Sequence, residues 1–267
     1  MRAPVVQPRL ATSLTCLGVG DGLLSATRGH AAFVYRFGGT QLLVDCGEPA
    51  ASSLCRGGWQ AEDLAAVFIS HLHFDHVGGL LTLLQAQGLA PRHRPLPVYL
   101  PRVGIPPLRT LMQAGCMGSL PTPLALSLEA LRVGRAVRVG EVTVAARHST
   151  HLEVMCGGTS GNGRFTEAFS FLLEGAGRRV AHSADLGGME DLAGLVEGPL
   201  DLLVCELSHL EPAAVWKVLA GRPIRRVVFV HLSATQWRAR RVLRSEARRA
   251  LRPMRVEIPE DGVRVAF

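Results

Sequence analysis

The sequence predicts a single α/β domain, and three observations support that prediction. Short apolar or alternating runs broken by glycine recur in the first 50 residues and indicate strands. Continuous apolar runs at Leu200–Cys205 and Val227–Val230 indicate buried strands, with helical stretches between and after them. Of the 267 residues, 48% are hydrophobic and 19% charged, which can close a large core and excludes a disordered or fibrous protein. No repeat or linker divides the chain, so we expect one domain over residues 1–267.

The predicted elements alternate between strands and helices along the chain. Gly38-Gly39 marks a hairpin turn between two early strands. The strands that we expect are Leu14–Gly18, Ala32–Phe37, Gln41–Asp45, Ala66–Ser70, Pro97–Leu100, Ala136–Val139, Val142–Ala146, Phe169–Leu173, Arg179–His182, Leu200–Cys205 and Val227–Val230. The helices that we expect are Ala50–Trp59, Gly78–Gln87, Leu108–Gly115, Pro212–Ala220 and Thr235–Leu251. The glycine-rich segment Gly157–Gly163 predicts a mobile loop.

Charge, hydropathy and cysteine content indicate which partners and which cellular compartment to expect. The 29 basic and 22 acidic residues give a net charge of +7, and Lys217 is the only lysine. Because nearly all the basic residues are arginine, we infer first a codon bias of a GC-rich genome and second a nucleic-acid partner. The apolar stretches fall far below the roughly 18 residues of a spanning helix, and Met1–Leu14 has no continuous apolar segment, so we expect no membrane span and no secretory signal. The six cysteines form no C-x-x-C pair, which favours free thiols in a reducing cytoplasm.

The strongest local signal is Ser70-His-Leu-His-Phe-Asp-His-Val-Gly-Gly79, which directly follows an apolar strand. Imidazole and carboxylate groups are the ligands that zinc and similar divalent cations prefer. His71 and His73 are two residues apart, so at an extended strand end they point the same way. Asp75 and His76 lie where the chain turns into a helix, so one loop could serve two neighbouring metal ions. A solvated, histidine-rich polar loop is the alternative.

This motif resembles the H-x-H-x-D-H signature of the metallo-β-lactamase superfamily, and the similarity covers essentially the whole chain. Leu42–Glu48 resembles the opening strand and D-x-G-E turn of the branch that contains ribonuclease Z and related phosphodiesterases. Ser183–Gly187 stands where that branch has S-G-D-T-G, and Leu203–Glu206 and Val228–His231 resemble its late strands. The resemblance implies a four-layer αβ/βα sandwich, in which two mixed sheets are flanked by helices and a dinuclear site lies on one edge.

The resemblance also implies a complete set of ligands for two metal ions. They are His71, His73 and His151 for the first ion, Asp75, His76 and His231 for the second, and Asp185 as the bridge. His148 is the alternative to His151, which the family's spacing favours. Asp45 resembles an aspartate that supports a metal-bound histidine. From the residues alone, His231 could simply end a strand, and Asp185 and Asp45 could each cap a turn.

The activity that the resemblance implies is hydrolysis by a metal-activated water. Two divalent ions, zinc foremost and manganese or iron also compatible, would activate the water, and Asp75 would orient it. Glu206 and His209 would protonate the leaving group or orient the substrate, with an exposed Ser-His loop as the alternative. All seven ligand positions are filled, which favours catalysis over a non-catalytic role in binding a metal or a metabolite.

A phosphodiester is the substrate that we expect, either RNA or a smaller molecule such as a cyclic nucleotide. The resemblance to ribonuclease Z favours it, as do the arginines of Thr235–Leu251, which spread around most of the predicted helix and could contact nucleic acid or form a solvated face. Ala184 and Leu186 depart from the S-G-D-T-G pattern, and no segment resembles the arm with which ribonuclease Z grips transfer RNA. A lactone or thioester hydrolase is one alternative, and a nucleic-acid-binding module built on the arginine-rich helix is another. The branch implies a homodimer.

Overall fold

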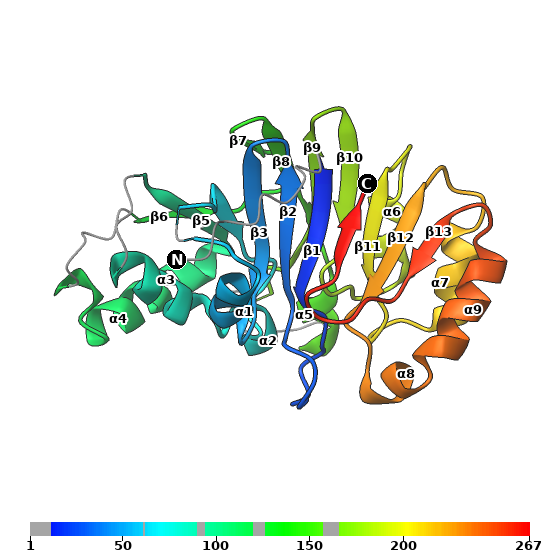
Figure 1. Cartoon of the computed structure of the whole chain (residues 1–267), viewed down its shortest axis with the longest axis horizontal. Coiled ribbons are helices and arrows are strands. Elements are labelled where there is room, and N and C mark those ends of the chain that lie inside the picture. Colours follow the sequence, from blue (N-terminus) through cyan, green and yellow to red (C-terminus); the bar gives the residue numbers. More distant parts are fainter. Residues whose placement is uncertain (1–11, 61, 90–93, 120–125, 157–165) are drawn as a thin grey trace, which may run out of the picture.

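Two sheets form the centre of the protein, and each changes from antiparallel to parallel pairing (Figure 1). The structure is a computed structural model that describes residues 12–60, 62–89, 94–119, 126–156 and 166–267. Within these residues the first sheet has seven strands, in the spatial order β14 (Arg264–Ala266), β1 (Thr12–Gly18), β2 (Ala32–Phe37), β3 (Thr40–Cys46), β4 (Ala66–Phe68), β5 (Leu96–Leu100) and β6 (Leu126–Ala130). Neighbours from β14 to β3 pair antiparallel, and neighbours from β3 to β6 pair parallel.

The second sheet repeats this design. Its seven strands in the described part of the chain are β13 (Arg255–Glu257), β12 (Arg226–Val230), β11 (Leu202–Glu206), β10 (Arg178–His182), β9 (Phe169–Gly175), β8 (Val142–His148) and β7 (Ala136–Val139). Neighbours from β13 to β10 pair parallel, and neighbours from β10 to β7 pair antiparallel. The parallel strands β11 and β12 are buried on both faces, which explains their continuous apolar runs.

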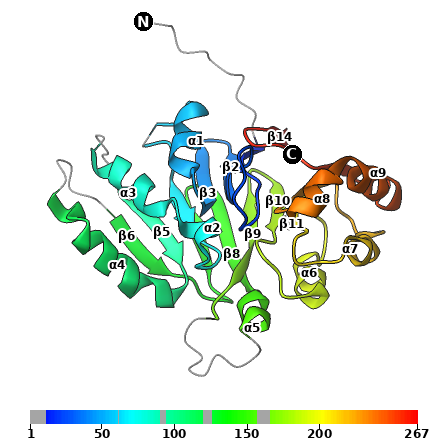
Figure 2. The ribbon, with the colours of Figure 1, turned by 90° about the horizontal axis from the view of Figure 1, so that it is seen from below.

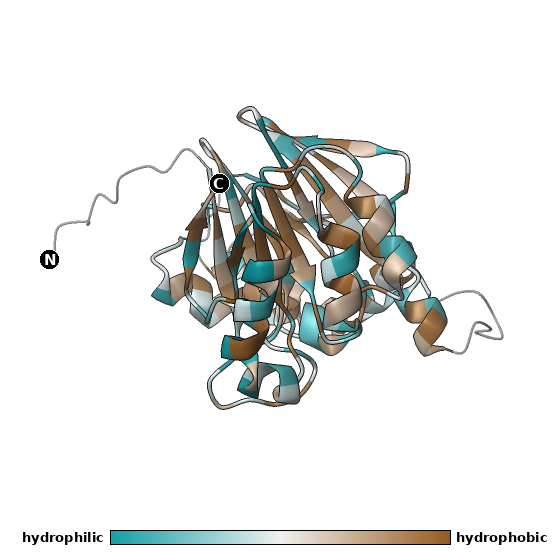
Figure 3. Ribbon diagram, turned by 90° about the vertical axis from the view of Figure 1, so that its right-hand side faces the viewer, coloured by the Kyte–Doolittle hydropathy of each residue, from teal (hydrophilic) through white to brown (hydrophobic). Residues whose placement is uncertain are grey.

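Helices cover the outer face of each sheet (Figures 1 and 2). The first sheet packs against α1 (Ala50–Arg56), α3 (Leu80–Leu89) and α4 (Ile105–Ala114), and the second against α6 (Met189–Leu195), α7 (Pro212–Leu219) and α9 (Arg240–Ala250). A third core fills the space between the sheets, where Phe33, Phe68 and Phe171 are buried. In Figure 3 the central strands are mostly hydrophobic, whereas the helices also carry polar residues. The expected four-layer αβ/βα sandwich is confirmed.

The structure differs from the expected helices and strands in two ways. The predicted helix Thr235–Leu251 is instead two helices, α8 (Ala234–Arg238) and α9, which meet at Ala239, where φ is −87° and ψ is 4°. Alanine favours helix, so neither composition nor periodicity could reveal this break. The structure also contains short elements that we did not expect, namely α2 (Phe74–Val77), α5 (His151–Met155), α6, β6, β13, β14 and the single 3-10 turns Arg102–Gly104 and Met117–Ser119. None of the described helices has the length and apolar character needed to cross a membrane.

The strand ends that matter for function meet at one edge of the sandwich. β3 and β4 run parallel in the first sheet, and β10, β11 and β12 run parallel in the second, so each group ends on the same side. In Figure 1 this is the lower edge, where α2 and α5 lie. Loops after the carboxyl ends of parallel strands are where α/β folds usually place their ligands.

Candidate metal centre

The metal motif begins where β4 ends, in the middle of the first sheet. Ile69 continues the strand direction by donating its N–H to the carbonyl of Tyr99 at 2.8 Å. The chain then turns into α2, a single helical turn that carries Asp75 and His76. His71 and His76 are buried, whereas Asp75 is partly exposed. The turn therefore presents the candidate ligands of one loop at the same edge.

Four residues form a first cluster whose ligand atoms all lie within 4.8 Å of one another, namely His71, His73, His151 and Asp185. Nε2 of His151 lies 3.3 Å from Nδ1 of His73 and 3.6 Å from Oδ2 of Asp185. Nε2 of His71 lies 3.7 Å from the same oxygen. Three imidazole nitrogens and one carboxylate oxygen are a ligand set that a divalent metal such as zinc accepts.

Asp75, His76 and His231 form a second cluster, whose ligand atoms also lie within 4.8 Å of one another. Nε2 of His231 lies 3.4 Å from Nε2 of His76 and 3.2 Å from Oδ2 of Asp75. The other carboxylate oxygen of Asp185, Oδ1, lies 3.3 Å from Nε2 of His76 and 3.6 Å from Nε2 of His231. Asp185 therefore offers one oxygen to each cluster, which is the geometry of a bridging carboxylate.

Two of these buried ligand atoms have no hydrogen-bond partner among the described residues. They are Nε2 of His71 and Oδ1 of Asp185. Burial, reinforced by the positive charge of His76, lowers the pKa of His71, so its ring is neutral. An unsatisfied buried polar atom costs about 1–3 kcal/mol. Cations between these atoms would remove that cost, so the residues present fit a pair of divalent metal ions.

Asp45, buried beneath the metal motif, orients two of the histidines. Its Oδ2 accepts a hydrogen bond from Nδ1 of His76 at 2.8 Å and another from the Ser70 hydroxyl at 2.9 Å. That hydroxyl also lies 3.0 Å from Nδ1 of His71. Because Nδ1 is engaged in both rings, Nε2 of each ring faces the clusters, as in many metal sites where a carboxylate fixes the histidine tautomer. The contact that the resemblance implied for Asp45 is therefore present.

Hydrogen bonds join the loop before His151 to the loop that carries Asp185. The side chains that form them were not predicted from the sequence. Asp191, in the first turn of α6, accepts hydrogen bonds from the backbone N–H groups of Thr150 and Gly187, both at 2.9 Å. The Ser149 hydroxyl donates to the carbonyl of Asp185 at 2.7 Å. A Cβ at Gly187 would lie 2.2 Å from the Thr150 hydroxyl, so only glycine permits this approach. No motif marks Asp191, because Thr150 is 41 residues away in sequence.

Glu206 is buried at the end of β11 and holds two neighbouring loops. Its Oε1 accepts a hydrogen bond from the N–H of Leu186 at 3.0 Å, next to the bridging carboxylate. Its Oε2 accepts from the N–H of His209 at 3.0 Å, and Oε1 lies 3.0 Å from Nδ1 of the same ring. Both carboxylate oxygens are engaged, so Glu206 acts on its surroundings through His209.

His209 lies at the open side of the clusters, with 29% of its side chain exposed. Its ring centroid is 4.6 Å from that of His151 and 5.6 Å from that of His231. Burial disfavours the imidazolium, but the hydrogen bond and charge of Glu206, together with Asp185, raise the pKa of His209 to about 9. The structure therefore brings all the residues expected at the site together, with His209 on its rim.

Three residues beside the clusters have a left-handed backbone, namely Asp45 (φ 57°), Ala184 (φ 47°) and His231 (φ 52°). This conformation costs an ordinary residue about 1–2 kcal/mol. Such strain gathers at functional sites because the surrounding structure must hold it in place. Ala184 occupies the position where the S-G-D-T-G pattern has glycine, which would bear no such cost.

Ala184→Gly is therefore expected to stabilise the protein by up to about 1 kcal/mol. Glycine removes the clash of the left-handed Cβ, although its greater freedom in the unfolded chain offsets part of the gain. Urea unfolding of both proteins in chelator measures the difference, and metal affinity should stay the same. A less stable variant would show that Ala184 is not strained.

Two histidines outside the clusters have other surroundings. His148, the alternative third ligand, has 48% of its side chain exposed and lies 3.1 Å from Oε1 of Glu153. His182 is buried, with its Nδ1 2.7 Å from the Tyr35 hydroxyl, and burial lowers its pKa to about 4. The predicted loop Gly157–Gly163 lies outside the described residues.

The sequence matches the model of a known protein family. Residues 40–232 match the family described as the beta-lactamase superfamily domain, and this segment includes both clusters and more than half of the chain. The chain belongs to this superfamily. The metallo-β-lactamase resemblance that the metal motif first indicated is thereby confirmed.

Curated relatives within the superfamily are named ribonucleases. Ribonuclease Z of Bradyrhizobium diazoefficiens is 27% identical over 188 residues, which cover 70% of this chain and 57% of that protein. Ribonuclease Z of Archaeoglobus fulgidus is 32% identical over 139 residues, which cover 52% of this chain and 44% of that protein. The chain thus spans about half the length of the curated relatives it matches.

Solved structures of the superfamily share the fold over nearly the whole chain. The metallo-β-lactamase fold protein YhfI from Bacillus subtilis has a TM-score of 0.76 and 20% identity, covering 95% of this chain and 99% of that one. The short form of human tRNase Z has a TM-score of 0.69 and 22% identity, covering 95% and 98%. At these identities the likeness shows a common fold.

Proposed function

We propose that the chain is a metal-dependent hydrolase of phosphodiesters. The observation that supports this most strongly is the position of Asp185, which directs one carboxylate oxygen toward each of two clusters of buried ligand atoms. Two adjacent cations held in this way suit the attack of water on a phosphodiester. The fold alone does not select the substrate. Relatives named ribonuclease Z support a phosphodiester.

The two clusters would hold one divalent cation each. The first would be held by His71, His73 and His151, the second by Asp75, His76 and His231, and both by Asp185. When bound, such a pair lowers the pKa of a water and stabilises the negative charge that builds on the attacked phosphate. We propose zinc, since histidine-rich sets with carboxylate suit it, and manganese and iron accept the same donors.

Asp75 is placed to orient the attacking water. Burial by itself would raise the pKa of Asp75, but the hydrogen bond from His231 and the charge of His76 hold it well below its usual range. The side chain therefore stays an ionised acceptor at the partly exposed edge of the site. Gly22 lies directly against it, and a Cβ at Gly22 would be 3.3 Å from Oδ2 of Asp75.

Proton donation to the leaving group is assigned in this proposal to Nε2 of His209. Glu206 engages Nδ1 of the ring, so Nε2 is the nitrogen that remains to face a substrate. The ring packs beside His151 and His231, on the open side of both clusters. Glu206 then serves as a positioning residue that holds the ring and favours its protonated form.

His209→Ala is expected to lower kcat by about 10²–10⁴-fold for an alkyl phosphodiester and far less for bis-(p-nitrophenyl) phosphate. The difference arises because p-nitrophenolate departs without needing a proton. Steady-state kinetics on both substrates, with metal content measured in parallel, tests this split. Equal losses on the two substrates at full metal content would exclude His209 as the donor.

The reaction class is tested by the zinc-reconstituted chain on three substrates, namely bis-(p-nitrophenyl) phosphate, a lactone and a thioester. Phosphodiester turnover should exceed the other two by a wide margin, disappear in chelator and return with zinc. Faster turnover of the lactone or thioester, or phosphodiester turnover that survives complete metal removal, would overturn the proposal.

A specific observation favours one second candidate, a lactone or thioester hydrolase. Phe74, between two candidate ligands, is 84% exposed, and Leu24, two residues after the glycine that contacts Asp75, is 94% exposed. Large apolar side chains exposed near a site suit an apolar acyl chain. The ring of Phe74 also suits stacking on a nucleobase. The same three-substrate assay distinguishes a lactone or thioester hydrolase from a phosphodiesterase.

The compartment that we propose is the cytoplasm. All six cysteines lie in the described part of the chain and none is paired, and Cys55, Cys116 and Cys156 are exposed. Exposed free thiols persist in a reducing environment and oxidise elsewhere.

A further inference from the structure

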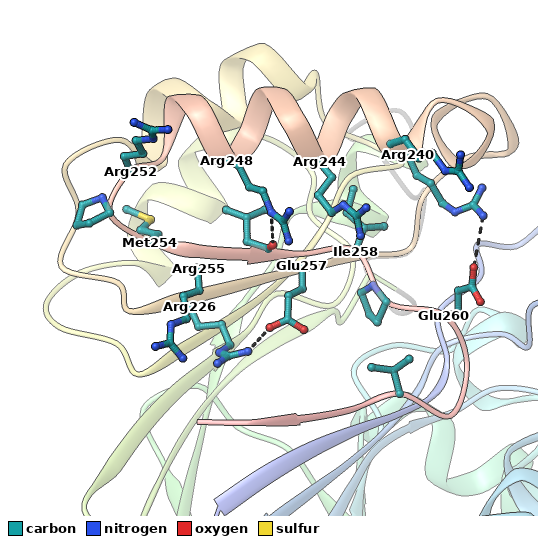
Figure 4. A pocket seen from close by; sticks show the side chains of 15 residues that line it. Arg226, Arg240, Arg244, Arg248, Arg252, Met254, Arg255, Glu257, Ile258 and Glu260 are labelled. Atoms are coloured by element: carbon teal, nitrogen blue, oxygen red, sulfur yellow. Dashed lines mark hydrogen bonds and ion pairs between the residues drawn. The ribbon is translucent and has the colours of Figure 1, made fainter.

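A groove lined by arginines runs along the outer edge of the second sheet, between α9 and β13 (Figure 4). It has a volume of about 910 Å³. Among the described residues it is lined by Arg226, Arg240, Arg241, Arg244, Arg248, Arg252 and Arg255, with Glu257 and Glu260 as the acidic members. Seven arginines against two glutamates leave a surplus of five positive charges, whereas the whole chain carries +7. Most of the net charge of the protein is thus concentrated in one concave surface.

Four of the five arginines of α9 line this groove, whereas we expected arginines around most of one longer helix. Three of them, Arg240, Arg244 and Arg248, are four residues apart in a row along one side of α9, and Arg252 follows just beyond the end of the helix. At 1.5 Å per residue the three on the helix recur about every 6 Å along roughly 12 Å. Figure 4 shows Arg244 and Arg248 extending from α9 toward the strands below. A regular row of cations matches a polymer with regularly repeated anions better than it matches a single small anion.

Most of this charge is not neutralised within the protein. Arg226 pairs with Glu257, and Arg240 lies 3.4 Å from Glu260. The side chains of four others are exposed and form no hydrogen bond or ion pair with any described residue, namely Arg241, Arg244, Arg252 and Arg255. Neighbouring like charges repel one another, so a bound polyanion would relieve that repulsion while gaining contacts.

One end of the groove is connected to the candidate metal centre. The guanidinium of Arg240 lies 4.5 Å from the ring centroid of Trp237, and that of Arg28 lies 4.8 Å from the same ring. Arg28 also donates a hydrogen bond to the carbonyl of Leu232 at 2.8 Å, next to His231. The other end lies at Arg226 and Arg255, which pair in register at the starts of β12 and β13, away from the metal edge.

We propose that this groove binds the phosphate backbone of RNA and leads the strand toward the metal centre. The choice of RNA rests on the proposed function. Guanidinium groups bind phosphate oxygens through two parallel N–H groups, and they do so without reading the sequence. Of the apolar lining residues, Met254, Val256 and Ile258 are buried, and only Pro253 and Val263 are exposed, so the groove offers little of the apolar surface with which a helix enters a membrane.

The test compares two triple variants that each remove three positive charges. The groove variant changes unpaired arginines, R244Q, R252Q and R255Q. The control variant changes exposed arginines on α4 and around β7, R109Q, R135Q and R138Q, with α4 at the far side of the molecule from α9 in Figure 1. Fluorescence anisotropy of a labelled single-stranded RNA measures Kd from low to moderate salt. It is run on the zinc-loaded full chain and again in chelator, where the RNA is not consumed.

The groove variant should bind RNA at least about tenfold more weakly at 0.1 M salt, and the slope of log K against log salt should be shallower by about 2, since each lost phosphate contact contributes about 0.7. The control variant should match the unmodified chain. Unchanged RNA binding by the groove variant, or equal weakening by both variants, would overturn the inference. So would groove-dependent binding to phosphatidylserine vesicles with no binding to RNA.

Turnover of bis-(p-nitrophenyl) phosphate keeps this test separate from the proposed function. That small substrate reaches the metal centre without the groove, so the groove variant should hydrolyse it at the rate of the unmodified chain. If the unmodified chain fails to hydrolyse this substrate, the proposed function is wrong. The RNA titration in chelator still tests whether the groove binds RNA.

Discussion

His151→Ala is expected to lose the metal of the first cluster and to lower phosphodiester turnover by about 10³-fold or more. His151 is buried and supplies one of three imidazole nitrogens, with Nε2 at 3.3 Å from Nδ1 of His73 and 3.6 Å from the bridging carboxylate. Metal-assisted stabilisation of a transition state contributes several kcal/mol, and each 1.36 kcal/mol corresponds to a factor of ten. Elemental analysis and kcat/KM measured on the same samples check both effects.

His148→Ala is the matched control, since it removes the same side chain three residues earlier. His148 is half exposed, points to Glu153 and takes no part in either cluster. We expect the control to keep its metal content and activity, and both variants to unfold at a similar denaturant concentration in chelator. If His148→Ala loses metal while His151→Ala keeps it, the assignment of the third histidine is wrong.

Asp185→Ala is expected to have the other large effect, because its two oxygens serve both clusters. Without it, each set of ligands loses a negative charge, and the two cations would face each other without a shared anion. Metal content should fall to near zero and turnover should be lost.

The comparison that isolates the bridge is Asp75→Ala, which removes a carboxylate from the second cluster alone. This variant should keep about one metal ion per chain. Metal content by elemental analysis after dialysis distinguishes the two variants. Equal metal loss in both, or full retention in Asp185→Ala, would refute a bridging carboxylate.

The sequence was informative where the chemistry is local. Four candidate ligands lie within six residues of one another, from His71 to His76, so their spacing alone predicted a metal site. Asp185 and His231 were assigned through the family resemblance, since nothing near them in sequence marks a ligand. The fold brings them together because β10 and β12 end at the same edge as β4.

The features that sequence reasoning missed depend on contacts between distant segments. Asp191 fastens two loops through partners that no pattern connects to it. The strain at Ala184 shows only in its φ of 47°. The break at Ala239 separates Arg238 from the arginines of α9, and only the structure shows that Arg240, Arg244 and Arg248 face a groove beside β13.

Anomalous diffraction from crystals of the zinc-reconstituted chain measures most directly whether this protein holds a pair of metal ions. Two zinc peaks about 3.5–4 Å apart are expected, one beside His71, His73 and His151 and the other beside Asp75, His76 and His231, with the carboxylate of Asp185 between them. A single peak, or peaks located away from Asp185 at full zinc loading, would contradict the account of the site.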